Sequence, residues 1–229
     1  MKTIGVLGGM GPQATMDFER RVHTAAQKLI PPQANSGYPP MVVCYHRAPP
    51  ILLKEDGTPR KPLEPDPDLL RAAEWLGGVA DFIVITSNMP HLIQAEIEQA
   101  SGKDVLSMVE AALDEVRARG WTKVGVLGMG EPTVYTRPLD ALGISSVILE
   151  ADARAPLNDA ILHLMEGRED AESHGVAVEA VDFLRSQGVD GIILGCTEIP
   201  LLLGEDAYPS DLLSPLPLLA DAAVARAIA

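Results

Sequence analysis

The stretch Ile4-Gly5-Val6-Leu7-Gly8-Gly9-Met10-Gly11-Pro12 joins a short apolar run to a glycine-rich turn and a proline that suits the start of a helix. A similar stretch, Val124-Gly125-Val126-Leu127-Gly128-Met129-Gly130-Glu131-Pro132, follows about 120 residues later. A second pair of similar stretches lies at 80–88 and 189–197, and these end in Thr86-Ser87-Asn88 and Gly195-Cys196-Thr197. Repeats this far apart indicate duplication of a whole lobe rather than a solenoid.

Short β-rich runs alternate with helical patterns along the chain, which is typical of βαβ units and a mostly parallel sheet. Strands are expected at 3–7, 41–46, 82–86, 123–127, 146–149 and 191–194. Helices are expected at 12–30, 67–76, 91–99, 105–119, 157–166, 173–187 and 216–228.

The pattern predicts an α/β fold of two similar lobes, each a mostly parallel sheet flanked by helices, related by pseudo-two-fold symmetry. We expect residues 1–103 with 210–229 to form the first lobe and residues 104–209 the second. Ligands of open α/β sheets bind at the carboxyl ends of the strands, so the active site is expected in the cleft between the lobes.

The composition favours a small-molecule function. The 229 residues include 47% hydrophobic residues, enough for a core, and 18 Lys and Arg against 32 Asp and Glu give a net charge of −14. This charge disfavours nucleic acid and anionic membranes as partners. The first apolar run begins at Ile4, directly after Met1-Lys2-Thr3, so no signal peptide is expected. No apolar run approaches the roughly 20 residues of a membrane span. Two cysteines are too few for a disulfide framework, so a cytoplasmic protein is expected.

Residues 47–67 form a long connection that is rich in proline and has neither helical nor strand periodicity. Such loops are either lids and binding loops or plain solvated excursions. Its basic residues, Arg47, Lys54, Arg60 and Lys61, are balanced by Glu55, Asp56, Glu64 and Asp66.

The loop Gly8-Gly9-Met10-Gly11 could bind an anion, because glycines let main-chain N–H groups approach a ligand and a helix start favours negative charge. It lacks the spacing of the dinucleotide fingerprint and the lysine of a phosphate-binding loop. A tight turn between strand and helix is the alternative.

Cys196 follows a buried strand and precedes an expected helix start at Thr197-Glu198-Ile199-Pro200. A helix N-terminus favours a thiolate, so the pKa of this thiol is expected to fall and Cys196 becomes a candidate base or nucleophile. An inert buried cysteine is the alternative, and Cys44 within its strand is assigned to the core.

Ser87 occupies the matching strand end of the first lobe, and His91 lies four residues further on. A serine hydroxyl needs a neighbouring base to act in proton transfer. Alternatively, Ser87 and Asn88 cap the following helix. The five histidines are scattered, so no metal site is expected.

Gly5 to Pro12 with Ala14-Thr15, together with Gly195-Cys196-Thr197-Glu198-Ile199-Pro200-Leu201-Leu202, resemble the aspartate/glutamate racemase superfamily over nearly the whole chain. The resemblance implies a PLP-independent isomerase without a cofactor, often a homodimer, that acts on a small acidic amino acid or dicarboxylate. One cysteine from each lobe would exchange protons with opposite faces of the α-carbon.

The resemblance assigns Cys196 and Ser87 as the catalytic pair. The residues it implies for substrate binding are Gly9, Met10, Arg47, Asn88, Met89, Thr133 and Thr197, with His91 and Glu198 in supporting positions. Arg47 is the candidate for the side-chain carboxylate, and Arg168 is a further basic candidate.

The chain departs from the family pattern at its first thiol, because Ser87-Asn88-Met89-Pro90-His91 stands where the family has Cys-Asn-Thr-x-His. We therefore expect a racemase that is impaired or stereoselective. The alternatives are a single-cysteine decarboxylase or isomerase of a small dicarboxylate, and an inactive homologue that binds carboxylates.

Overall fold

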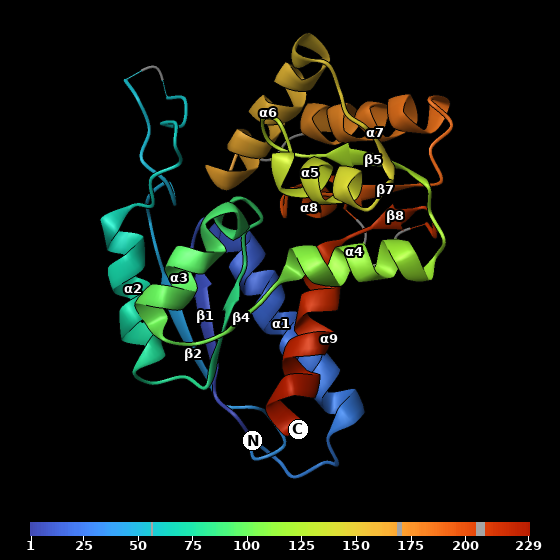
Figure 1. Ribbon diagram of the computed structural model, residues 1–229. Coiled ribbons are helices and arrows are strands. Elements are labelled where there is room, and N and C mark those ends of the chain that lie inside the picture. The colour runs from blue at the N-terminus through green and yellow to red at the C-terminus, as the bar shows by residue number, and fades with distance from the viewer. Residues whose placement is uncertain (56, 169–170, 205–208) are drawn as a thin grey trace. The chain divides into compact units, whose positions relative to one another are not determined.

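A computed structural model describes residues 1–55, 57–168, 171–204 and 209–229 of the protein. The chain divides into two compact units (Figure 1). Unit 1 comprises Met1–Met108 and Leu216–Ala229, and unit 2 comprises Val109–Pro215.

Each unit alternates strands and helices. The strands are β1 (Ile4–Gly8), β2 (Met41–Tyr45), β3 (Phe82–Ile85), β4 (Val105–Leu106), β5 (Lys123–Leu127), β6 (Ser145–Val147), β7 (Gly191–Leu194) and β8 (Leu212–Leu213). The helices are α1 (Pro12–Leu29), α2 (Pro67–Gly77), the 3₁₀ helix η1 (Met89–Ile93), α3 (Gln94–Ser101), α4 (Met108–Ala118), α5 (Thr133–Ala141), α6 (Ala151–Met165), α7 (Ala171–Ser186), α8 (Ile199–Leu203) and α9 (Pro215–Ile228).

The two sheets have the same topology. The order in unit 1 is β2-β1-β3-β4 and that in unit 2 is β6-β5-β7-β8, and all pairs are parallel. In the first sheet Ile4 lies opposite Met41 on one side and Phe82 on the other. In the second, Val124 lies opposite Ser146 and Gly191. The prediction of two similar α/β units with parallel sheets is therefore confirmed.

The sequence did not predict the short elements. Strands β4 and β8 have two residues each, and helix α5 was also absent from the prediction, whereas α8 begins at the helix start expected after Cys196. The helix expected from residue 105 begins at Met108 because Val105 and Leu106 pair with β3. That pairing also extends the first segment of unit 1 to Met108, beyond the expected boundary at residue 103.

Helices α2 and α3 cover one face of the first sheet, with Leu69, Ala73, Leu76 and Ile97 in the buried core. They pack closely, since a methyl group built on Gly77 would lie 1.9 Å from the carbonyl oxygen of Ser101.

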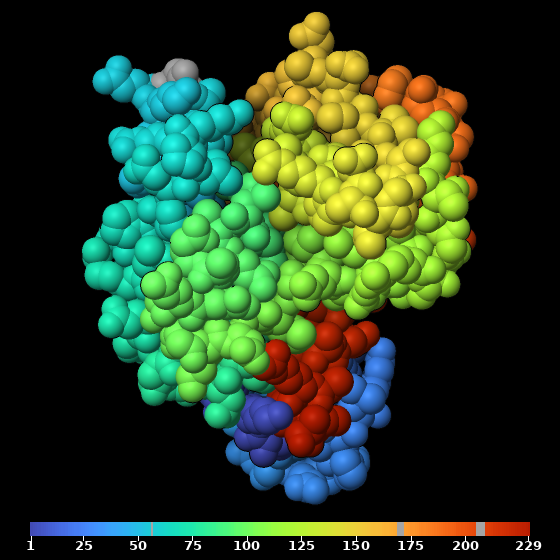
Figure 2. Space-filling view, in the orientation of Figure 1, coloured from blue at the N-terminus to red at the C-terminus, as the bar shows by residue number. Residues whose placement is uncertain are grey.

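The last helix completes unit 1. Figure 2 shows the C-terminal residues in red directly against the N-terminal residues in blue. The Lys2 amide donates to the Ala227 carbonyl at 2.7 Å, and the Arg226 guanidinium lies 4.9 Å from the centre of the Phe82 ring. Both ends of the chain are thus part of one folded unit.

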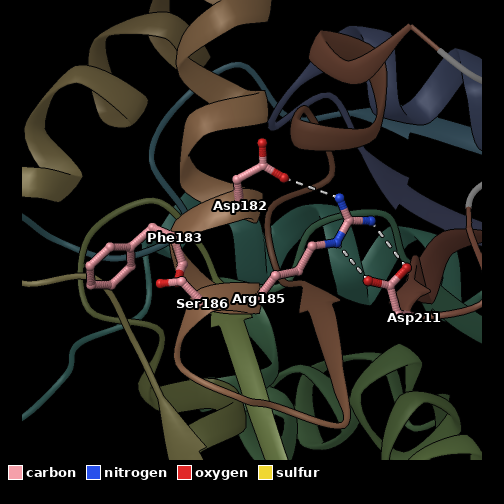
Figure 3. Close-up of polar contacts among 5 residues, drawn as sticks. All are labelled: Asp182, Phe183, Arg185, Ser186 and Asp211. Atoms are coloured by element: carbon pink, nitrogen blue, oxygen red, sulfur yellow. Dashed lines mark hydrogen bonds and ion pairs between the residues drawn. The ribbon is translucent and has the colours of Figure 1, made fainter.

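In unit 2, helix α7 is tied to the segment before β8 by an arginine (Figure 3). Nε and Nη2 of Arg185 donate to the carboxylate of Asp211 at 2.7 and 3.1 Å, and Nη1 donates to Asp182 at 3.2 Å. The two-point contact fixes the end of α7 against the edge of the second sheet.

The connection at 47–67 is an antiparallel arm, drawn in cyan in Figure 1. Leu52 donates its amide to Glu64 at 2.8 Å, and Lys54 donates to Thr58 at 2.8 Å. The side chain of Ile51 is buried at the base of the arm. Asp56, counted in the charge balance, lies outside the described residues.

No helix within residues 1–55, 57–168, 171–204 and 209–229 is long and apolar enough to cross a membrane. In the same described part of the chain, no group of three or more His, Cys, Asp or Glu side chains could hold a metal ion.

An aspartate before the third main strand anchors the start of the central strand in each unit. Asp81 accepts the Thr3 amide at 2.6 Å in unit 1. In unit 2, one oxygen of Asp190 accepts the amides of Thr122 and Lys123 and the Thr122 hydroxyl, at 2.7, 2.9 and 2.9 Å. These hydrogen bonds, that of the Thr122 amide first, hold the pKa of Asp190 below its ordinary value.

We predict that Asp190→Asn lowers the thermal unfolding midpoint at pH 7 by a few degrees, because Asn is a weaker acceptor for three donors. A carboxylate whose pKa is lowered in the folded protein stabilises it above its unfolded-state pKa, and this contribution disappears as the pH falls through the folded-state value. Unfolding midpoints measured from pH 7 to pH 3 should therefore converge for the two proteins at the acid end. A difference that stays constant across that range would contradict this account.

Candidate functional site

The glycine loop between β1 and α1 is shaped by close contact with the end of β2. Gly9 has a φ of +87°, and a methyl group built on it would lie 2.7 Å from the His46 carbonyl oxygen. The His46 amide donates to the Gly8 carbonyl at 2.8 Å. Only glycine suits Gly9, because both its backbone angle and its surroundings exclude a side chain.

The amide of Gly9 already has a partner within unit 1. It donates to the Thr15 hydroxyl at 2.9 Å. Of the two amides expected to bind a substrate carboxylate, this one is therefore used to hold the loop against α1. Met10, the other candidate, is half-buried and packs against the hydrophobic core that includes residues of α2.

Ser87, Asn88 and Met89 follow β3 at the carboxyl edge of the first sheet, beside the glycine loop that follows β1. The side chain of Ser87 is half-buried, that of Asn88 is buried and that of Met89 is exposed. The structure thus brings the predicted residues of the first lobe to one sheet edge.

His91 contacts main-chain groups with both ring nitrogens. Nδ1 lies 3.0 Å from the Ser87 carbonyl and 3.1 Å from the Asn88 carbonyl, and Nε2 accepts the Met108 amide at 3.3 Å. These partners require a neutral ring with its proton on Nδ1. Burial lowers the pKa of His91 to about 4, although the two carbonyls oppose that effect. His91 therefore holds the strand end in place and is poorly suited to act as a base.

Arg47 follows β2 and is exposed. Its guanidinium lies 4.7 Å from the centre of the Tyr45 ring, and the Tyr45 hydroxyl donates to Glu19 at 3.0 Å. A guanidinium stacked on an aromatic ring keeps its hydrogen-bond donors available. Arg168, the other basic candidate, is exposed and donates Nε to the Glu166 carboxylate at 2.8 Å.

In unit 2, Cys196 lies at the carboxyl end of β7 beside a buried carboxylate. Its thiol donates to Oε2 of Glu198 at 3.1 Å, and the Thr197 hydroxyl donates to the same oxygen at 2.9 Å. Glu198 is only 2% exposed, and among the described residues its Oε1 atom has no hydrogen-bond partner. Cys196, Thr197 and Glu198 thus form one polar cluster.

The expected lowering of the Cys196 pKa is wrong. Burial raises the pKa of this thiol well above its ordinary value, and the Glu198 carboxylate raises it further, while main-chain hydrogen bonds from Glu198 and Met129 oppose these effects. Helix α8 has only five residues. In this position burial and a neighbouring negative charge outweigh the helix dipole. Burial likewise raises the pKa of Glu198.

The sequence prediction missed two residues of unit 2, one beside Cys196 and one that holds the turn after β5. Tyr135 on α5 has a fully buried side chain, and its ring contacts Gly195, the residue before Cys196. Asn158 on α6 accepts the Gly130 amide at 3.0 Å. Thr133, which was predicted, is the half-buried first residue of α5. The repeat could have indicated Tyr135, since it aligns this position with Thr15.

Cys44 is partly buried in β2 and packs against the core as expected.

Two α/β units with the same parallel sheet topology, and polar side chains after the third strand of each, place the chain in the class of two-unit α/β proteins whose ligands bind at the carboxyl ends of the strands. The chain belongs to the Asp/Glu/Hydantoin racemase family, whose pattern matches residues 7–224.

Individual relatives agree with this assignment. The chain is 28% identical over 210 residues to the broad specificity amino-acid racemase RacX of Bacillus subtilis (strain 168), covering 87% of each protein. Its fold is similar to that of an aspartate racemase from Picrophilus torridus, with a TM-score of 0.80, 20% identity, and coverage of 99% of this chain and 94% of the other. A putative Asp/Glu racemase from Yersinia pestis matches with a TM-score of 0.75 and 23% identity over the whole of both chains.

We predict that Glu198→Gln lowers the pKa of Cys196, because the substitution removes a negative charge 3.1 Å from the sulfur. The measurement is the pH dependence of alkylation by iodoacetamide, read for each cysteine by peptide mass spectrometry. The midpoint for Cys196 should move to lower pH while that for Cys44 stays unchanged. An unchanged or higher midpoint for Cys196 would show that Glu198 does not act on the thiol.

A second prediction concerns His91. The pKa of about 4 in the folded protein lies below the ordinary value of 6.5, so the unfolded chain takes up this proton first as the pH falls. Acidification from pH 7 to pH 4 should therefore lower the free energy of unfolding of the wild type by up to about 3 kcal/mol more than that of His91→Asn. Contact of the ring with solvent would make this difference smaller. Urea unfolding at a series of pH values measures the difference, and parallel curves for the two proteins would contradict it.

Proposed function

We propose that the protein is a PLP-independent aspartate/glutamate racemase-like enzyme that exchanges or inverts the α-carbon of a small acidic amino acid by thiol-based proton transfer. The observation that carries the proposal is the hydrogen bond of 3.1 Å between the Cys196 thiol and the Glu198 carboxylate. Membership of a racemase family adds the reaction class.

The proton transfers follow from this pair. Glu198 accepts the proton of the Cys196 thiol, and the resulting thiolate removes the α-proton of the substrate. The electron pair of the broken C–H bond passes into the α-carboxylate, where hydrogen-bond donors must stabilise the developing enolate charge. Return of a proton from Cys196 restores the same enantiomer, and delivery from the opposite face produces the other.

The opposite proton donor in this proposal is Ser87. A hydroxyl is a far weaker acid than a thiol, so delivery from this side is slow and one enantiomer is favoured. The contacts around Ser87 support its assignment as a weak proton donor. His91 hydrogen-bonds to the main-chain carbonyl of Ser87 and does not act as a base toward the Ser87 hydroxyl.

The substrate contacts in this proposal are among those that the family resemblance implies. Met10 and Asn88 supply donors to the α-carboxylate, Thr197 keeps its hydroxyl hydrogen-bonded to Glu198 beside Cys196, and Arg47 binds a side-chain carboxylate as a two-point contact. Support for Arg47 comes from its exposed guanidinium on the Tyr45 ring. Because the relative from Bacillus subtilis is named for broad specificity, amino acids with neutral side chains belong in the substrate panel.

A single-thiol reaction on a small dicarboxylate is the second candidate, and the serine at position 87 favours it. A decarboxylase requires one proton donor after loss of carbon dioxide, so Cys196 alone would suffice. Release of carbon dioxide from substituted malonates tests this candidate directly.

The test of the main proposal is proton NMR of both enantiomers of aspartate, glutamate and alanine in deuterated buffer. We expect loss of the α-proton signal of one enantiomer, at least a hundredfold slower exchange in Cys196→Ala, and faster inversion in Ser87→Cys. Chiral chromatography of the same samples separates inversion from exchange. Absence of exchange in all samples, including Ser87→Cys, would reject the racemase proposal for these substrates.

A further inference from the structure

The internal repeat places one residue of α1 and one residue of α5 at equivalent positions, and each of them lies against the strand end that carries one member of the proposed acid/base pair. Pro12 aligns with Pro132, so Thr15 and Tyr135, each three residues further on, occupy equivalent positions. Ser87 aligns with Cys196, so the residues that precede them, Thr86 and Gly195, are also equivalent. In each unit the helix residue contacts the residue at the strand end: Thr15 contacts Thr86 in unit 1, and Tyr135 contacts Gly195 in unit 2.

In unit 1 the contact is a pair of buried hydroxyls. Oγ1 of Thr15 lies 2.8 Å from Oγ1 of Thr86, and the two side chains are 0% and 1% exposed. The Thr15 hydroxyl also accepts the Gly9 amide at 2.9 Å and lies 3.2 Å from the Gly11 carbonyl, so it joins the glycine loop to Thr86. A methyl group built on Gly8 would lie 2.6 Å from Thr15, so the pair fills the space beside the end of β1.

In unit 2 an aromatic ring replaces the hydroxyl pair. A methyl group built on Gly195 would lie 3.1 Å from Cδ2 and Cε2 of Tyr135 and 2.8 Å from the Leu127 carbonyl. The Tyr135 side chain is 0% exposed and comes from α5, the equivalent of α1. The ring and the glycine together leave the main chain before Cys196 little room to move.

We propose that Thr15 and Tyr135 are matched positioning residues, which hold the strand ends that carry Ser87 and Cys196 respectively. Each contacts the residue before the acid/base position, Thr86 in unit 1 and Gly195 in unit 2. The inference rests on the proposed function for its catalytic meaning, but its structural content concerns the two strand ends alone. Displacement of about 1 Å at such a position is enough to slow proton transfer strongly.

The experiment uses a protein with one reactive thiol in each unit, made by combining Ser87→Cys with Cys44→Ala. Alkylation rates by iodoacetamide are measured for both thiols by peptide mass spectrometry in the presence of Thr15→Val or Tyr135→Leu. We expect Tyr135→Leu to change the rate at Cys196 at least threefold while leaving the thiol at position 87 unchanged. Thr15→Val should have the reverse effect.

Conservative variants separate positioning from general stability. Thr15→Ser keeps the hydroxyl and Tyr135→Phe keeps the ring, so both should restore the rates to within twofold of the parent protein. If Tyr135→Leu does not fold, Gly195→Ala displaces the same contact, and Thr86→Val is its counterpart in unit 1. Equal changes at both thiols, or no change at either, would overturn the inference.

Turnover provides a second readout in the protein with its natural serine. Tyr135→Leu should slow the α-proton exchange that depends on Cys196 at least tenfold, and Tyr135→Phe should retain it. If the wild type exchanges no α-proton, the proposed function fails while the alkylation rates still decide the positioning roles. If exchange occurs and the alkylation rates are unaffected, the positioning roles fail alone.

Discussion

Strands β1 and β5 each hydrogen-bond to a parallel neighbour on both sides, and their central residues are buried. A parallel strand with both edges paired has a fixed register, and its carboxyl end must lie beside the carboxyl ends of its neighbours. In unit 1 this constraint brings the glycine loop after β1 together with Ser87 after β3. In unit 2 it does the same for the turn after β5 and Cys196 after β7. The positions of the candidate site residues within each unit therefore follow from the pairing of one strand.

The chemistry at Cys196 depends on a balance between solvation and neighbouring charge. A short helix start stabilises a thiolate by a limited amount, whereas removal from water and a carboxylate at 3.1 Å both favour the protonated thiol. Such a thiol becomes a base only when its proton can leave, and the neighbouring carboxylate is the group within reach. Burial and the carboxylate of Glu198 therefore both keep the proton on the sulfur of Cys196.

The sequence predicted all the described strands of three residues or more. For β1, β3, β5 and β7 the reason is burial, which requires continuous apolar runs. Strand β6 is Ser-Ser-Val and largely exposed, so burial does not explain its prediction. Strands β4 and β8 escaped prediction since two residues carry no period, and their pairing is set by the rest of the sheet. The candidate site could be located from the repeat and the family motifs. Its electrostatics could not. The burial of Glu198 depends on how other segments pack around it, and the hydrogen bond from the Gly9 amide to Thr15, six residues further on, depends on the local path of the loop, which the residue pattern does not show.

Unit 1 is assembled from both ends of the chain, whereas unit 2 is one continuous segment. During synthesis on the ribosome, the residues of unit 2 emerge before α9, so the second unit can complete its core while the first still lacks its last helix. Until α9 arrives, the Lys2 amide and the ring of Phe82 are without their partners Ala227 and Arg226. The nascent first unit therefore exposes an unfinished apolar face for the time it takes to translate the second, and α9 serves as the closing element that ends this exposure.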